Sequence, residues 1–220
     1  MSSKVILGYW NIRANGEPIR LMLNYLGVDY TEVNYYKTDD KSDWLAVKES
    51  VGIPFPNLPY LIDEDVKLTE SYAIMRHLAR KHGKLYPETD TENRFCDQLQ
   101  GIIYDFRSTY TKTLYDRDTH DESKAQFLAE FPGKMSKFEK HLSSRKWLAG
   151  NRLMYVDFMF AEFLSCLQLW LPSCLEPFPI ASQYLKTFDS LEPIASYRST
   201  KRFRQLPILR KVAVFGGQFE

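Results

Sequence analysis

The spacing of hydrophobic positions changes along the chain and divides it into two parts. In the first part, up to about residue 83, short apolar or alternating runs are typical of strands. These runs lie at residues 4–9, 28–36, 59–62 and 66–69. Apolar residues recur at helical spacing in the segments 18–26, 43–50 and 71–82. The predicted order is strand, helix, strand, a connection with a short helix, and then strand, strand, helix.

Beyond the polar connector at 85–93, only helical patterns remain. The predicted helices are 92–115, 122–142, 156–171, 180–190 and 191–204, with a bend at Pro132–Gly133 in the second. The third is apolar on nearly every side, so we expect it at the centre of a helical domain. The fold class is therefore an α/β N-terminal thioredoxin-like domain plus an all-α C-terminal helical domain. We place the first domain at 1–83, a linker at 84–91 and the second domain at 92–220.

Composition and charge exclude several classes of protein. With 220 residues, 44% of them hydrophobic, the chain can form one large or two smaller cores. The formal net charge is +1 and basic residues are scattered among acidic ones, so no nucleic-acid partner is expected. The three cysteines form no CxxC pair, and we expect buried, reduced thiols rather than disulfides or a metal site. The N-terminal apolar run is too short for a signal sequence, and charged residues interrupt 156–171, so we expect a soluble cytoplasmic protein without membrane contact.

The helix over 71–82 has features that suit an anion. Ser71 is its expected N-cap, because serine accepts hydrogen bonds from the first turn. That turn also presents unpaired N–H groups and the positive end of the helix dipole. A carboxylate fits such a place. The alternative is an ordinary capped helix with nothing bound.

The segment before this helix favours a bound ligand. Pro59 follows Leu58 and opens a strand, which is a setting for a cis peptide bond. A cis bond would turn the N–H and C=O of Leu58 outward, where an extended peptide pairs with them like an added strand. With a carboxylate at the Ser71 helix end, the predicted ligand is a small acidic peptide.

Motifs along nearly the whole chain resemble those of one enzyme family. They are GYWNIR at 8–13, DWLAVK at 43–48, FPNLPYLID at 55–63, SYAIMRHLARKH at 71–82, RKWLAGN at 145–151 and VDF at 156–158. The set resembles the cytosolic glutathione transferases, and most of all their mu class. The resemblance implies a homodimeric detoxification enzyme that joins the thiol of reduced glutathione to small hydrophobic electrophiles. Glutathione, an acidic tripeptide, would be a co-substrate, with no cofactor or metal.

By this resemblance Tyr9 is the catalytic residue. Its hydroxyl would hydrogen-bond the glutathione sulfur and favour the thiolate, which attacks the electrophile. Lowering the thiol pKa from about 8.5 by about two units needs about 3 kcal/mol, which one or two well-placed donors supply.

The resemblance also implies which residues hold the two substrates. Those that would bind glutathione are Trp10, Lys41, Trp44, Lys48, Asn57, Leu58, Pro59, Glu70, Ser71 and, from the neighbouring subunit, Asp105. Trp44 and Lys48 are four residues apart, so we expect both on one helix face at the glycyl carboxylate. Those that would line the electrophile site are Trp10, Asn15, Tyr115 and Leu209, and the aromatic key of the dimer would be Phe55.

Several positions depart from the family pattern. Asn15 stands where mu-class members often carry an apolar residue, and Arg210 where a small polar one is common, which predicts a more polar electrophile site. Met154 replaces a capping Ser or Thr before the apolar helix, at an expected cost of about 1 kcal/mol. The loop at 36–44 is several residues shorter than the mu-class loop. Two other functions stay open: a non-catalytic ligand-binding or structural relative, and a glutathione-dependent isomerase of the sigma type.

Overall fold

The computed structural model describes residues 4–35 and 41–217, and within them a four-stranded sheet forms the core of the N-terminal part. Its strands are β1 (Val5–Trp10), β2 (Tyr30–Tyr35), β3 (Tyr60–Asp63) and β4 (Val66–Thr69), in the order β2-β1-β3-β4. The β1 strand runs parallel to β2 and antiparallel to β3, and β3 is antiparallel to β4. Along the chain, the strands and helices of this part follow one another in the predicted thioredoxin-like succession.

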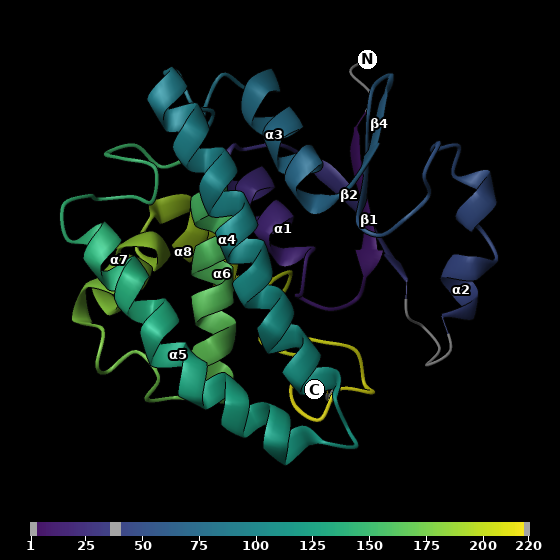
Figure 1. Ribbon diagram of the computed structural model, residues 1–220. Coiled ribbons are helices and arrows are strands. Elements are labelled where there is room, and N and C mark those ends of the chain that lie inside the picture. Colours follow the sequence, from purple (N-terminus) through teal and green to yellow (C-terminus); the bar gives the residue numbers. More distant parts are fainter. Residues whose placement is uncertain (1–3, 36–40, 218–220) are drawn as a thin grey trace.

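Helices cover both faces of the sheet. They are α1 (Glu17–Tyr25), α2 (Ser42–Leu45) with a following 3-10 turn η1 (Lys48–Ser50), and α3 (Ser71–Lys81). Helices α1 and α3 lie between the sheet and the helical part, and α2 lies on the outer side (Figure 1). Leu7 and Leu61 belong to the main core on the inner side, and Tyr60 and Trp44 to a smaller core on the outer side.

The rest of the chain is helical. Its helices are α4 (Asp90–Tyr115), α5 (His120–Leu142), α6 (Tyr155–Trp170), α7 (Pro179–Asp189) and α8 (Glu192–Arg198). As its apolar sequence predicts, α6 is buried at all positions except Ser165, Gln168 and Leu169, and it runs through the middle of the helical part (Figure 1). The predicted fold class is confirmed, whereas the exact domain boundaries stay a prediction.

The start of α6 shows how a helix forms without the usual cap. Met154 supplies no hydroxyl there, but Asp157 accepts the Met154 N–H at 2.8 Å and the Leu148 N–H at 2.9 Å. Tyr184 donates a third hydrogen bond to the same carboxylate, also at 2.9 Å. Burial nevertheless raises the pKa of Asp157 to about 6, because the carboxylate is removed from water.

Four expectations were wrong, and three of them concern helices. Helix α3 begins at Ser71 as predicted, but its N-cap is Glu70, whose φ of 68° turns the chain out of β4, so Ser71 is the first helical residue. The helix expected over 43–50 ends at Leu45, because the chain turns there before η1, and Trp44 and Lys48 therefore do not share one α-helix. The last helix ends at Arg198, short of the expected 204.

The fourth concerns the cysteines. Cys96 and Cys166 are buried as expected, but Cys174 is only half-buried, because it lies in the turn after α6, and all three are free thiols. Among the residues described, no helix is long and apolar enough to cross a membrane.

Candidate functional site

Tyr9 lies near the end of the central strand β1, with its side chain buried. Its hydroxyl oxygen accepts the N–H of Asn15 at 3.1 Å. Its ring packs against the backbone at Gly16, where an added Cβ would lie only 2.3 Å from Cδ1 of Tyr9. The loop between β1 and α1 therefore fixes both the ring and the hydroxyl.

The surroundings of Tyr9 keep its hydroxyl protonated. Burial raises the pKa of Tyr9 to about 12, against the Asn15 N–H and the positive charges of Arg107 and Arg20, which lower it. The group is neutral at physiological pH, so it is a hydrogen-bond donor. An N–H that donates to its oxygen polarises the O–H bond and strengthens that donor.

A buried ion pair anchors the loop that carries Asn15. The guanidinium of Arg13 donates to both carboxylate oxygens of Glu162 in α6, at 2.8 and 2.9 Å, and both side chains are buried. Burial opposes the charge of Glu162, but the Arg13 guanidinium outweighs it and holds the pKa of that carboxyl below its usual value. The backbone N–H of Arg13 also donates to the carbonyl of Pro207, at 2.9 Å. The loop is thus tied to the helical part and to the C-terminal tail.

A cavity of about 200 Å³ opens beside Tyr9. The residues expected at the electrophile site all line it: Trp10, Asn15, Tyr115 and Leu209. Tyr115, the last residue of α4, accepts the backbone N–H of Arg210 at 2.9 Å, so the tail that brings Leu209 to the cavity is fixed to α4. Arg210 lies at the same cavity with its guanidinium 6.0 Å from the ring centre of Trp10, so this wall is polar, as expected.

A second cavity of about 730 Å³ adjoins the first and reaches the start of α3. Ser71 and Glu70 line it, together with Arg107 and Thr111 of α4. The two cavities share Asn15, Arg107, Thr111 and Tyr115. The helix end predicted to hold a carboxylate and the tyrosine predicted to hold a sulfur therefore open on one continuous cleft.

Other residues expected to bind glutathione lie near the Ser71 helix end or on the outer side of the sheet. The Leu58–Pro59 peptide bond is cis, which confirms that prediction. The Asn57 amide donates to the Glu70 carboxylate at 3.3 Å, with both side chains exposed. Trp44 is buried against Tyr60, with ring centres 6.1 Å apart.

The two lysines of this set flank Trp44. Lys41 precedes α2 with a φ of 67°, and Lys48 opens η1; both side chains are half-buried. The short loop before Lys41 falls on residues 36–40, outside the described residues.

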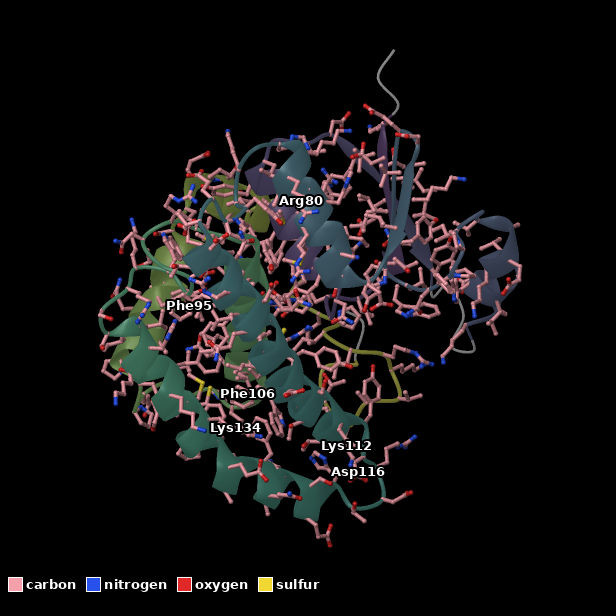
Figure 2. All side chains as sticks on the ribbon, turned by 45° about the horizontal axis from the view of Figure 1, so that its top comes forward. Arg80, Phe95, Phe106, Lys112, Asp116 and Lys134 are labelled. Atoms are coloured by element: carbon pink, nitrogen blue, oxygen red, sulfur yellow. The ribbon has the colours of Figure 1, made fainter. Side chains whose placement is uncertain are left out.

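The structure does not bring Phe55 or Asp105 into this cleft. Phe55 is 83% exposed. Asp105 is exposed on α4 and lines a separate groove of about 420 Å³ between α4 and α5. In that groove the Lys134 ammonium lies 5.6 Å from the ring centre of Phe106, and Figure 2 shows the two side chains between the helices.

Sequence reasoning missed two features of the cleft. The first is Arg107, which lines both cavities. Helical spacing predicts that Arg107 lies on a helix, but it does not predict that this face of the helix lines a cavity. The second is the Arg13–Glu162 pair, for which a signal exists: a carboxylate in a helix that is apolar all round needs a buried cationic partner. No cluster of metal-ligating side chains is found among the described residues.

Comparison with known proteins gives the family. The model of the family "Glutathione S-transferase, N-terminal domain" matches residues 5–80, and that of "Glutathione S-transferase, C-terminal domain" matches residues 104–201. Glutathione S-transferase 2 of Gallus gallus is 39% identical over 220 residues, which cover 98% of this chain and 99% of that protein.

Further comparisons agree. Glutathione S-transferase Mu 1 of Bos taurus is 39% identical over 218 residues, covering 97% of this chain and 99% of that protein. The crystal structure of the glutathione S-transferase Blo t 8 superimposes with a TM-score of 0.90 at 30% identity, covering 96% of this chain and 99% of that one. The chain belongs to the glutathione S-transferase family.

Proposed function

We propose that this protein conjugates the thiol of reduced glutathione to small hydrophobic electrophiles. The observation that carries the proposal is the Tyr9 hydroxyl, which is buried, neutral and held by the Asn15 N–H at the wall of a cavity. The Asn15 N–H occupies a lone pair of the Tyr9 oxygen and not its proton, so the O–H group can still donate to an acceptor in the cavity. A sulfur placed there receives this hydrogen bond more strongly as a thiolate than as a thiol.

The required stabilisation is within reach of such a donor. Lowering the thiol pKa by about two units corresponds to about 3 kcal/mol of preferential interaction with the thiolate. A charge-assisted hydrogen bond from a preorganised donor contributes about 1.5–3 kcal/mol. Ionisation by Tyr9 and proximity of the electrophile in the adjoining cavity are then the main contributions to the rate.

For glutathione itself we propose a binding site at the start of α3 and along the neighbouring loop. The Ser71 helix end would take the γ-glutamyl carboxylate, because Ser71, Tyr72 and Ala73 of the first turn line the larger cavity and a helix N-terminus favours an anion. The backbone of Leu58 would pair with the cysteinyl unit. The residues proposed to complete the site are Trp10, Lys41, Trp44, Lys48, Asn57, Pro59 and Glu70. The electrophile would occupy the smaller cavity, against Asn15, Tyr115 and Leu209.

We further propose a homodimer in which Phe55 of one subunit enters the groove between α4 and α5 of the other. Phe55 is a large hydrophobic side chain that is 83% exposed. The groove has an apolar floor that includes Leu99 and Phe106. Asp105 lines the groove, and from there its carboxylate would pair with the amino group of glutathione bound to the other subunit. We also propose that the protein is cytoplasmic, because its three cysteines are free thiols and its proposed substrate, reduced glutathione, is kept reduced in the cytoplasm.

The direct test combines binding and turnover. The purified protein should be retained on immobilised glutathione, be eluted by free glutathione and conjugate 1-chloro-2,4-dinitrobenzene. Retention without turnover would instead support the non-catalytic reading, and the absence of both would refute the proposal.

A further inference from the structure

Arg107 occupies the point where the two cavities of the cleft meet. It lies on α4 and is half-buried, and Thr111 lies one turn further on the same helix face. Both residues line both cavities. A group bound next to Tyr9 and a group bound near Ser71 would therefore each pass this arginine.

The guanidinium of Arg107 is only partly engaged within the protein. One N–H donates to the carbonyl of Ala14 at a long distance, 3.5 Å. Among the ion pairs of the described residues, none involves Arg107. A guanidinium has five N–H donors in a planar fork, and Arg107 lines both cavities, so a group bound in the cleft can reach donors that this single long bond leaves available.

The carboxylates of the cleft are already occupied. Among the described residues that line the two cavities, they are Glu70 and Glu162. Glu70 accepts from Asn57, and both oxygens of Glu162 accept from Arg13. Neither carboxylate forms an ion pair that would neutralise the positive charge of Arg107.

Further positive charge surrounds the cleft. Lys112 lines the larger cavity near the C-terminal end of α4 (Figure 2), and Arg210 lines the smaller one. The charge of Arg107 acts on several groups at the centre, lowering the pKa of Tyr9, Tyr110 and Cys166 against the stronger effect of their burial. The smaller cavity is thus lined both by apolar Leu209 and by the cationic residues Arg107 and Arg210.

We propose that Arg107 binds an anionic group of the electrophile, so that the enzyme favours hydrophobic electrophiles that carry a carboxylate. This inference rests on the proposed conjugation of glutathione and specifies the substrate class of the same site. A carboxylate pairs with the guanidinium fork through two charge-assisted hydrogen bonds, which fixes its orientation as well as its position. Lys112 and Arg210 raise the local concentration of anions at the cleft.

The test compares two electrophiles that react by the same chemistry. 1-Chloro-2,4-dinitrobenzene is neutral, and 4-chloro-3,5-dinitrobenzoate carries a carboxylate; in both, the thiolate adds to the ring carbon and chloride leaves. For each, kcat/KM is divided by the uncatalysed rate constant with glutathione. The substitution Arg107→Gln should lower the ratio of kcat/KM to the uncatalysed rate constant. The fall should be about tenfold greater for the benzoate than for the neutral compound, because a charge-assisted pair is lost.

Two further variants control the comparison. Arg107→Lys keeps the charge but not the fork, and should retain part of the preference. Arg94→Gln, an exposed arginine near the start of the same helix, should change neither ratio. Circular dichroism checks that the variants fold, and salt should weaken the preference of the parent.

Each other outcome overturns the proposal. An equal fall for both electrophiles would mean that Arg107 acts on the shared thiolate step, and a raised glutathione KM alone would mean that it holds glutathione. If the parent conjugates neither electrophile, the proposed function fails. The anion site at Arg107 is then tested by ligand binding alone. In that case, quenching of tryptophan fluorescence by 3,5-dinitrobenzoate should weaken about tenfold in Arg107→Gln, with 1,3-dinitrobenzene as the neutral probe. An unchanged affinity would refute the anion site.

Discussion

Adding one methyl group at Gly16 should displace the Tyr9 ring and expose how closely the rate depends on its position. The new Cβ of Gly16→Ala would lie 2.3 Å from Cδ1 of Tyr9 and 3.0 Å from Cγ and Cε1, whereas ordinary contact begins at 3.4 Å. The backbone cannot easily withdraw, because the Gly16 carbonyl accepts the N–H groups of Ile19 and Arg20 at the start of α1. The ring must therefore move by about 1 Å in a tightly packed core.

The substitution should affect stability, glutathione affinity and kcat/KM to different extents. The overpacked site should lower the free energy of unfolding by about 1–3 kcal/mol. The hydroxyl, which lies 3.1 Å from the Asn15 nitrogen, would move out of good hydrogen-bonding geometry. A displacement of about 1 Å from the reacting atom can reduce the rate by up to about 100-fold, so we expect kcat/KM to fall about 10–100-fold while glutathione affinity changes little. Urea unfolding, calorimetric glutathione binding and conjugation kinetics measure the three quantities.

The chain offers a matched control and a test of the route. Gly133 in α5 has nothing within 4 Å of an added Cβ, so Gly133→Ala should leave kcat/KM unchanged. If Gly16→Ala acts through the Tyr9 hydroxyl, it should have much less effect on kcat/KM in a Tyr9→Phe background. Parent-like kinetics and stability in Gly16→Ala would refute the reasoning, as would fully additive losses in the double variant.

The remaining predictions concern binding, assembly and pH. Ser71→Ala should raise the glutathione KM and leave kcat nearly unchanged, because a ground-state contact is removed; a fall in kcat alone in steady-state kinetics would contradict this. Phe55→Ser should weaken association in sedimentation and raise the glutathione KM together, since Asp105 would complete the site across the interface; a monomer that binds glutathione as tightly as the parent would contradict this. Burial raises the pKa of Asp157 from 3.8 to about 6, so the folded state holds the extra proton and stability should fall as pH rises through that range. Asp157→Asn should flatten this dependence in unfolding experiments, and an unchanged slope would assign it to other groups.

Those features of the fold that local periodicity determines can be predicted from the sequence. The alternation of strand and helix patterns predicts the order of elements along the chain, and the apolar run over 156–171 predicts the buried α6. The order of strands within the sheet, β2-β1-β3-β4, is seen only in the folded chain. The break between α2 and η1 is not visible in such patterns, because the segment 43–50 has helical spacing throughout and a local turn overrides it. The same limit explains Glu70, whose positive φ is imposed by the passage from β4 to α3.

The site divides in the same way. The resemblance names Tyr9, Asn15 and Ser71 one at a time, but a motif carries no information on the hydrogen bond from the Asn15 backbone or on the shape of the cleft. Arg107 was missed for a related reason: an arginine on a long helix looks solvated unless the tertiary packing is known. The sequence indicates that Glu162 needs a buried cationic partner, but only the folded chain shows that this partner is Arg13, 149 positions away.

The most direct test of the central claim is the titration of the thiol of bound glutathione by thiolate absorbance. In the parent the apparent pKa should lie about two units below the value of about 8.5 for a free thiol. In Tyr9→Phe it should rise by about one unit or more, and kcat should fall about tenfold or more, because the donor to the thiolate is gone. Tyr25→Phe, which alters a half-buried tyrosine at the far end of α1, should leave the titration unchanged. A Tyr9→Phe enzyme whose bound thiol titrates as in the parent would contradict the claim that the Tyr9 hydroxyl stabilises the thiolate.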